Sequence, residues 1–183
     1  MSEELVIRQC APTLAGIKTG NLFCTTFESR EALLADVRSL NQRLRHKGLC
    51  LLPLRCRGNQ VLLYLYRPAK LRCDLKNDLA LRMLSQAGYG CESAERCVVT
   101  LIRRLRERAE FPHEIGLFLS YPPEDVKGFI ENGARGFKCS GLWKVYSDEA
   151  YARAAFAKYK KCTAIYCQLW QAGSSLEQLA VAV

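Results

Sequence analysis

Residues 111–133 read FPHEIGLFLSYPPEDVKGFIENG, and the order of elements along the chain is best inferred from them. Residues 115–119 form an apolar run of strand length, and Pro122-Pro123 ends that strand, because proline has no N–H group to offer a neighbouring strand. Pro123 also suits the first turn of a helix, and Gly133 is a natural cap at the helix C-terminus. The stretch therefore predicts a strand followed by a helix.

The residues after this helix repeat the same order. The segment GLWKVY, residues 141–146, contains a second predicted strand at 143–146, and Ser147 is followed by two acidic residues that favour the start of another helix. A strand–helix–strand–helix order is the unit from which α/β sheets are built.

Apolar periodicity and turn residues predict the remaining elements. They are a short strand at 5–7, a helix from 28 to Gly48, a β-hairpin of 49–56 and 60–66 with its turn at Gly58-Asn59, a helix from 68 to Gly88 or Gly90, helices at 93–110 and 148–161, a last strand at 164–169 and a helix from 174. Pro53 places the first hairpin strand at a sheet edge or at a bulge. We therefore predict a single α/β domain over residues 1–183, with a small mixed sheet that contains a β-hairpin and is flanked by five to six helices.

The composition is that of an ordinary globular protein, with 49% hydrophobic and 25% charged residues in 183. No apolar run approaches the roughly 18 residues that a membrane span needs. The first residues, MSEEL, lack the basic flank and apolar core of a signal peptide. We therefore expect a cytoplasmic protein without a membrane span.

Ten cysteines and only two histidines bear on metal binding. Cytosolic thiols are normally reduced, so most of these cysteines are expected to be small buried hydrophobes. No C-x-x-C motif occurs, and the spacing matches neither a zinc ribbon nor a ferredoxin. The sequence therefore names no metal ligands and no cofactor, although a cluster of cysteines distant in sequence stays open. So many thiols fit an anaerobic cell.

The formal net charge is +9 and the pI is about 9.1, which favours an acidic partner. The basic side chains gather in residues 38–47 and 96–108. We interpret both runs as solvated faces of amphipathic helices. Nucleic acid is disfavoured, because no known motif is present and no aromatic residues alternate with the basic ones.

A second unusual segment, CAPTLAGIKTGNLF, spans residues 10–23 and allows two interpretations. Pro12 in the first turn of a helix would leave Cys10 just before the positive helix end, where the thiol pKa falls. The segment could instead be a loop whose N–H groups hold an anion together with four polar side chains, Thr13, Lys18, Thr19 and Asn21.

The chain resembles a known family in four segments. Residues 10–23, residues 111–133, GLWKVY at 141–146 and KKCT at 160–163 are similar to the bacterial family called domain of unknown function 3793. The similar blocks span nearly the whole chain. The resemblance supplies no activity; it implies an anaerobic cytoplasmic setting, in which members occur beside flavodoxin and iron-uptake functions.

Two functional hypotheses follow. In the first, the protein is an enzyme with a papain-like pair, in which Cys10 is the nucleophile and His113 the base, and one of Glu114, Asn21 and Asp125 orients the imidazole. In the second, it is a basic binding or accessory module.

The module would bind an acidic, flavodoxin-like redox partner, or an anionic ligand held by the loop at residues 13–21. Lys138 and Lys144, with Arg135, would add positive charge around the glycine-rich turn 133–141. We favour the second hypothesis, because the charge is a property of the sequence itself, whereas the proximity of Cys10 and His113 is not.

Overall fold

The computed structural model describes residues 1–90, 92–107 and 110–182. These residues form two compact units. Unit 1 comprises residues 1–69 and 161–183, and unit 2 comprises residues 70–160.

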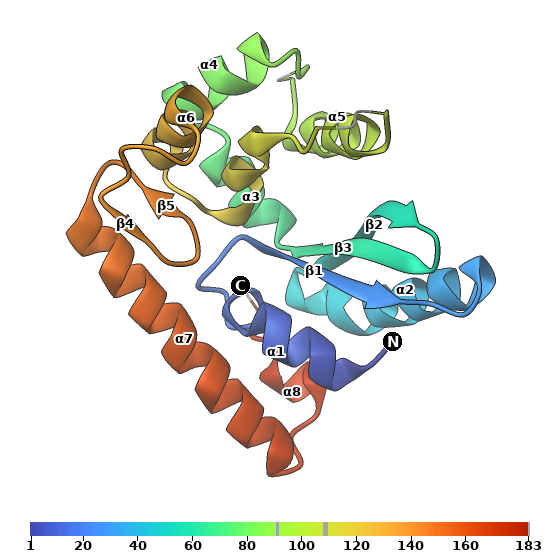
Figure 1. The fold of residues 1–183 in the computed structure, drawn as a ribbon. Helices are drawn as coiled ribbons and strands as arrows, with labels where there is room; N and C mark the ends of the chain where they lie inside the picture. The colour runs from blue at the N-terminus through green and yellow to red at the C-terminus, as the bar shows by residue number, and fades with distance from the viewer. Residues whose placement is uncertain (91, 108–109, 183) are drawn as a thin grey trace. The chain divides into compact units, whose positions relative to one another are not determined.

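Unit 1 is built on a three-stranded antiparallel sheet (Figure 1). The strands are β1 (Gly20–Thr26), β2 (Cys50–Arg57) and β3 (Gln60–Tyr66), in the order β1-β3-β2. The helices are α1 (Glu3–Leu14), α2 (Arg30–Leu44), η1 (Arg45–Lys47), α8 (Leu176–Leu179) and the C-terminal part of α7 (Glu149–Gln171).

The core of unit 1 lies between one face of this sheet and three helices. Val61, Leu63 and Leu65 point to the same face, because side chains alternate along a strand, and all three are buried. They belong to one cluster with residues of α1, α2 and α8. Val61, Leu63 and Leu65 therefore mark the face of the sheet that these helices cover, although Tyr64 and Tyr66 on the opposite face are buried as well.

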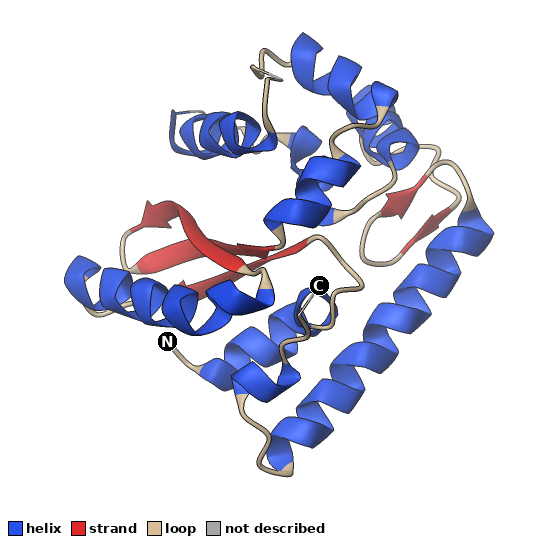
Figure 2. Ribbon diagram, turned by 180° about the vertical axis from the view of Figure 1, so that it is seen from behind, coloured by secondary structure: helices blue, strands red, loops and turns tan. Residues whose placement is uncertain are grey.

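Unit 2 is mainly helical, with a small two-stranded antiparallel sheet (Figure 2). Its elements are α3 (Pro68–Asp74, whose first two residues lie in unit 1), α4 (Asp78–Gln86), α5 (Ala94–Glu107), η2 (His113–Leu119), α6 (Pro123–Asn132), β4 (Cys139–Ser140), β5 (Lys144–Val145) and the N-terminal part of α7. Helix η2 and α6 pack on one another, and β5 contacts α6.

The α/β class and the hairpin are confirmed, and the sheets are antiparallel rather than mixed. Strand β2 lies at a sheet edge, and its register shifts between Pro53 and Arg55, as the proline predicts. Gly133 caps α6, which begins at Pro123. Within the part of the chain that the structure describes, no helix is both long and apolar enough to cross a membrane.

Three predicted strands are wrong. Residues 5–7 lie within α1, whose N-terminus is capped by the Ser2 side chain. Residues 164–169 lie within α7. Residues 115–119 lie in η2, a 3-10 helix, and not in a strand. All five are buried, so they show the unbroken apolar pattern that a buried helix shares with a buried strand.

Two further differences concern the first half of the chain. The expected helix from residue 68 is two helices, because Asn77 accepts hydrogen bonds from two backbone N–H groups and caps a new start at Asp78. Strand β1 occupies residues that the sequence assigned to a helix or loop. It pairs with β3 along its whole length, from Gly20↔Tyr66 to Thr26↔Gln60.

Candidate functional site

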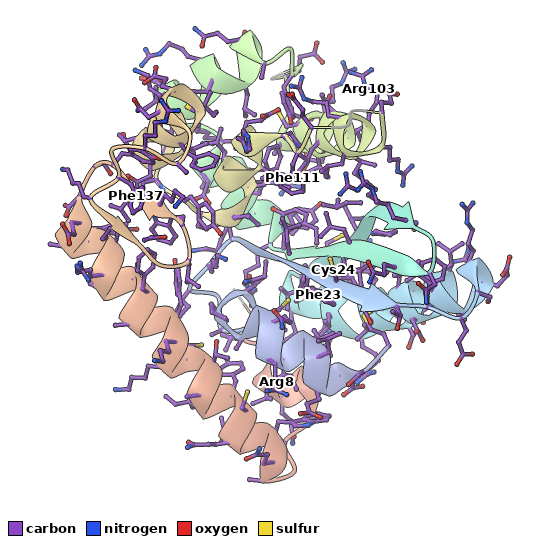
Figure 3. All side chains as sticks on the ribbon, in the orientation of Figure 1. Arg8, Phe23, Cys24, Arg103, Phe111 and Phe137 are labelled. Carbon is purple, nitrogen blue, oxygen red and sulfur yellow. The ribbon has the colours of Figure 1, made fainter. Side chains whose placement is uncertain are left out.

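The strongest candidate site is a pocket of about 320 Å³ in unit 2. We call it the aromatic pocket, because four of its walls are aromatic rings. It is lined by Phe111, His113, Ile115, Gly116, Tyr121, Asp125, Val126, Phe129, Ser140, Gly141, Trp143 and Lys144. These residues come from the segment around η2, from α6, and from the hairpin of β4 and β5. Figure 3 labels Phe111 just before η2 and Phe137 just before β4.

The indole of Trp143 connects the hairpin to the rest of the pocket. Its ring lies 4.8 Å from the ring of Tyr121 and 4.5 Å from the ring of Phe156 on α7, measured between centroids. The Tyr121 hydroxyl donates to the carbonyl of Leu142, at 3.1 Å. Stacked and edge-on rings hold one another in defined orientations, so this wall of the pocket is preformed.

Asp125 fixes the hairpin onto α6. Its carboxylate accepts four hydrogen bonds, from Trp143 Nε1 at 2.7 Å, from the backbone N–H groups of Tyr146 and Ser147 at 2.8 Å each, and from the Ser147 hydroxyl at 2.7 Å. Burial by itself raises the pKa of Asp125, but these hydrogen bonds together outweigh burial and hold the pKa below its usual value. Asp125 is therefore a charged anchor for the hairpin, with its oxygen atoms engaged inside the protein.

Two glycines let the walls approach closely. A Cβ atom on Gly116 would lie 2.7 Å from the Val126 side chain, and one on Gly141 would lie 2.3 Å from the ring of Phe156. Real Cβ atoms do not approach other atoms so closely. Glycine at these positions is therefore needed for η2 to pack on α6 and for the hairpin to pack on α7.

Positive charge borders the pocket on the hairpin side. Residues 133–147 carry three basic side chains, Arg135, Lys138 and Lys144, and no acidic one. The Lys144 ammonium lies 4.1 Å from the centre of the Phe137 ring, and Lys138 donates to the carbonyl of Ser147. Lys144 lines the pocket itself, so the structure brings this sequence candidate to the cavity.

His113 and Asp125 are further sequence candidates at the pocket. The exposed His113 ring packs edge-on against Phe129, with 4.9 Å between ring centroids. Glu114, one of the three residues considered for orienting the imidazole, has other contacts: it accepts a hydrogen bond from the Tyr89 hydroxyl at 3.0 Å and forms an ion pair with Arg104 at 3.0 Å. Burial, followed by the nearby Glu114 carboxylate, raises the pKa of Tyr89.

Cys10 lies in unit 1, whereas His113 lies in unit 2. Pro12 is inside α1 rather than in a first turn, so Cys10 is in the C-terminal half of this helix, away from the positive end that would stabilise a thiolate. The Cys10 side chain is fully buried, and burial raises the pKa of its thiol, an effect that Lys18 only partly opposes. These surroundings favour the neutral thiol.

The polar candidates at residues 13–21 do come together, at the connection between α1 and β1. The Thr13 hydroxyl donates to Asn21 Oδ1 at 2.8 Å, and the N–H of Lys18 donates to the Pro12 carbonyl. Lys18 is buried, and burial lowers the pKa of its ammonium to about 8, although the Cys10 thiol acts in the opposite direction. Thr19 is also buried, and its carbonyl accepts from the N–H of Arg67.

Arg67 explains why this connection is so well ordered. Its guanidinium is buried and donates to four backbone carbonyls, those of Thr13, Leu14 and Val181 at 2.7 Å each and that of Lys47 at 2.9 Å. The carbonyls of Thr13 and Leu14 are at the negative end of α1, where a cation is favoured. Two backbone carbonyls of this segment thus bind an internal cation, the Arg67 guanidinium. In the sequence, the buried role of Arg67 is indicated only by its position directly after the apolar strand 60–66.

The aromatic walls of the pocket were not predicted. Phe111, Tyr121, Phe129 and Trp143 are not among the candidate residues that the sequence indicates. Trp143 is buried, so a ring can belong to the core and line a cavity at once. For metal binding, the described residues hold no group of three or more histidine, cysteine or acidic side chains placed to bind an ion.

The model of a family described as "Protein of unknown function (DUF3793)" matches residues 6–180. No curated protein matches the chain, and no solved structure does.

Proposed function

Because the chain belongs to this family of unknown function, we propose from its own structure that it is a binding protein for a small anionic molecule with a flat, aromatic body. The observation that carries the proposal is the aromatic pocket, a preformed cavity with Lys144 among its walls. Ligand sites are typically concave and mostly apolar, with a few polar groups that fix orientation.

The aromatic rings support a flat ligand. The walls include Phe111, Tyr121, Phe129 and Trp143, and rings of this kind favour stacked or edge-on contact with another ring. The volume of about 320 Å³ is at the lower end of the range for small-molecule sites, which suits a ligand of one or two fused rings.

The charges support an anion. Segment 133–147 is purely basic in its charged side chains, and the whole chain carries a formal charge of +9. Asp125 is the one acidic residue among the described residues of the walls, and its four hydrogen bonds stabilise its charge internally. Lys144 is then the side chain that meets the ligand's negative group, with Ser140 as a neutral partner.

The test compares three probes that share a ring system and differ in charge: 2-naphthoate, neutral 2-naphthamide and (2-naphthylmethyl)trimethylammonium. Isothermal titration calorimetry should give the tightest binding for 2-naphthoate. Lys144→Met should weaken naphthoate about tenfold, because a charge-assisted hydrogen bond is lost, and should leave naphthamide unchanged. Lys158→Met, on the exposed side of α7, is the matched control and should bind like the wild type.

Two results would refute the proposal. One is the absence of binding for all three probes. The other is tightest binding of the quaternary ammonium, which would mean that the rings and Asp125 together form a cage for a cation.

A further inference from the structure

A second pocket, of about 530 Å³, adjoins the aromatic pocket in unit 2. We call it the mixed-charge pocket. Its walls are Leu79, Arg82, Met83, Gln86, Ala87, Arg104, Glu110, Phe111, Pro112, His113, Glu114, Lys127, Ile130 and Glu131. Phe111 and His113 line both pockets, so these two side chains form the partition between them.

Helix α6 contributes wall residues to both pockets. Val126 and Phe129 line the aromatic pocket, whereas Lys127 and Ile130 line the mixed-charge pocket, because residues one position apart point about 100° apart around a helix. The edge-on contact of His113 with Phe129 fixes the imidazole against this helix. Phe111, which is 39% exposed, completes the partition. Helix α6 and the exposed partition of Phe111 and His113 therefore separate the two pockets.

The mixed-charge pocket differs from the first in chemistry. Among the described residues, its walls carry side chains of both signs: Arg104 pairs with Glu114, and Lys127 lies 3.6 Å from Glu131. Arg82 and Glu110 are two further charged residues of these walls, of opposite sign and exposed. A pocket with both signs on its walls is complementary to a ligand group that also carries both signs.

We propose that the two pockets form one site, and that its ligand has two parts, an anionic aromatic head and a zwitterionic tail of the amino-acid type that extends past His113. In this arrangement the tail carboxylate meets Arg82 and its ammonium meets Glu110. The inference rests on the proposed function, because the head occupies the aromatic pocket. It names the ligand class as an aromatic acid joined to an amino acid.

The test uses four amides of naphthalene-2,6-dicarboxylic acid, which all keep one free carboxylate on the head. The amide partners are methylamine, glycine, ethylenediamine and 2,3-diaminopropionic acid, which give no tail charge, an anionic, a cationic and a zwitterionic tail. Calorimetry should show that the zwitterionic compound binds at least about tenfold more tightly than the methylamide.

Variants then assign the two ends of the tail. Arg82→Met should remove the gain from the carboxylate and Glu110→Gln the gain from the ammonium, while both leave the methylamide unchanged. Arg103→Met, an exposed arginine on α5 that lines neither pocket (Figure 3), is the matched control and should keep the full gain.

Binding of all four compounds with equal affinity would overturn the two-part ligand and leave the proposed function standing. Absence of binding for all four would overturn both.

Discussion

Lys18 gives the sharpest quantitative prediction, because it is a buried ammonium whose pKa falls from 10.5 to about 8 on folding. The difference corresponds to a cost of about 3 kcal/mol at neutral pH, where the lysine is charged in both states. Between pH 7 and 9 the folded protein releases this proton, whereas the unfolded chain keeps it. The unfolded state then binds more protons, so the free energy of unfolding rises with pH, by roughly 1 kcal/mol from this group.

Cys10 acts in the opposite direction at higher pH. Burial raises its pKa, so above its ordinary value of 9.0 the unfolded thiol ionises while the folded one does not, and stability falls. The contribution of Lys18 is therefore measured as a difference between the wild type and Lys18→Met, and only up to pH 9.

The assay is urea unfolding at pH 7, 8 and 9 in reducing buffer, followed by circular dichroism. The free energy of unfolding of the wild type, minus that of Lys18→Met, should rise by roughly 1 kcal/mol from pH 7 to 9. Lys158→Met should follow the wild type at each pH. An equal pH dependence in the wild type and Lys18→Met would refute the burial of this ammonium, and with it the reading of residues 13–21 as an internal structure.

Three further predictions concern packing and hydrogen bonding, and each is measured by urea unfolding at pH 7. Asp125→Asn should lower the free energy of unfolding by about 2–3 kcal/mol, because the amide cannot accept all four hydrogen bonds. Ser147→Ala removes only one of these hydrogen bonds and should lower the free energy of unfolding by about 1 kcal/mol. Equal losses of stability in the two variants would contradict the anchoring role of Asp125. Gly141→Ala should lower the free energy of unfolding by about 1–3 kcal/mol through overpacking. Gly90→Ala, where an added Cβ meets nothing within 4 Å, should leave it nearly unchanged. Similar values for the two variants would contradict the close packing of Gly141 against the Phe156 ring. Arg67→Met should lower the free energy of unfolding by about 3–5 kcal/mol, because it leaves four carbonyls without their donor, and Arg67→Lys should recover part of this loss. A loss under about 1 kcal/mol in Arg67→Met would show that the guanidinium does not stabilise the connection between α1 and β1.

Local signals in the sequence predicted the elements that local chemistry decides. Pro123 and Gly133 bound α6, Ser29 caps α2, and the Gly58-Asn59 turn joins β2 to β3. In each case the residue satisfies a backbone requirement within a few positions of itself. Long-range context has little influence on such positions.

The misassigned segments depend on contacts that are distant in sequence. Residues 115–119 form a fully buried apolar run, for which periodicity does not distinguish strand from helix. The choice follows from tertiary packing: Gly116 fits against Val126 of α6, and Ser120 ends η2 with a left-handed backbone, at φ 59°. Strand β1 likewise forms because β3 supplies its hydrogen-bonding partners.

The candidate site shows the same division. Charge and nucleophile chemistry singled out Lys144 and His113, and both line the aromatic pocket. The aromatic walls gave no signal of their own, because the sequence pattern of a ring that lines a cavity equals that of a ring in the core. The interest in Cys10 depended on a helix that starts at Pro12. Because α1 begins at Glu3, Cys10 does not lie at the positive end of a helix.

The most direct test of the central claim is the fluorescence of Trp143 during titration with 2-naphthoate, in a Trp170→Phe background that leaves Trp143 as the only tryptophan. With excitation at 295 nm and correction for probe absorbance, binding in the aromatic pocket should change the emission saturably. The midpoint should equal the calorimetric dissociation constant and should shift about tenfold in Lys144→Met. Calorimetric binding without any change in Trp143 emission, or with a midpoint unaffected by Lys144→Met, would show that the ligand binds outside the aromatic pocket.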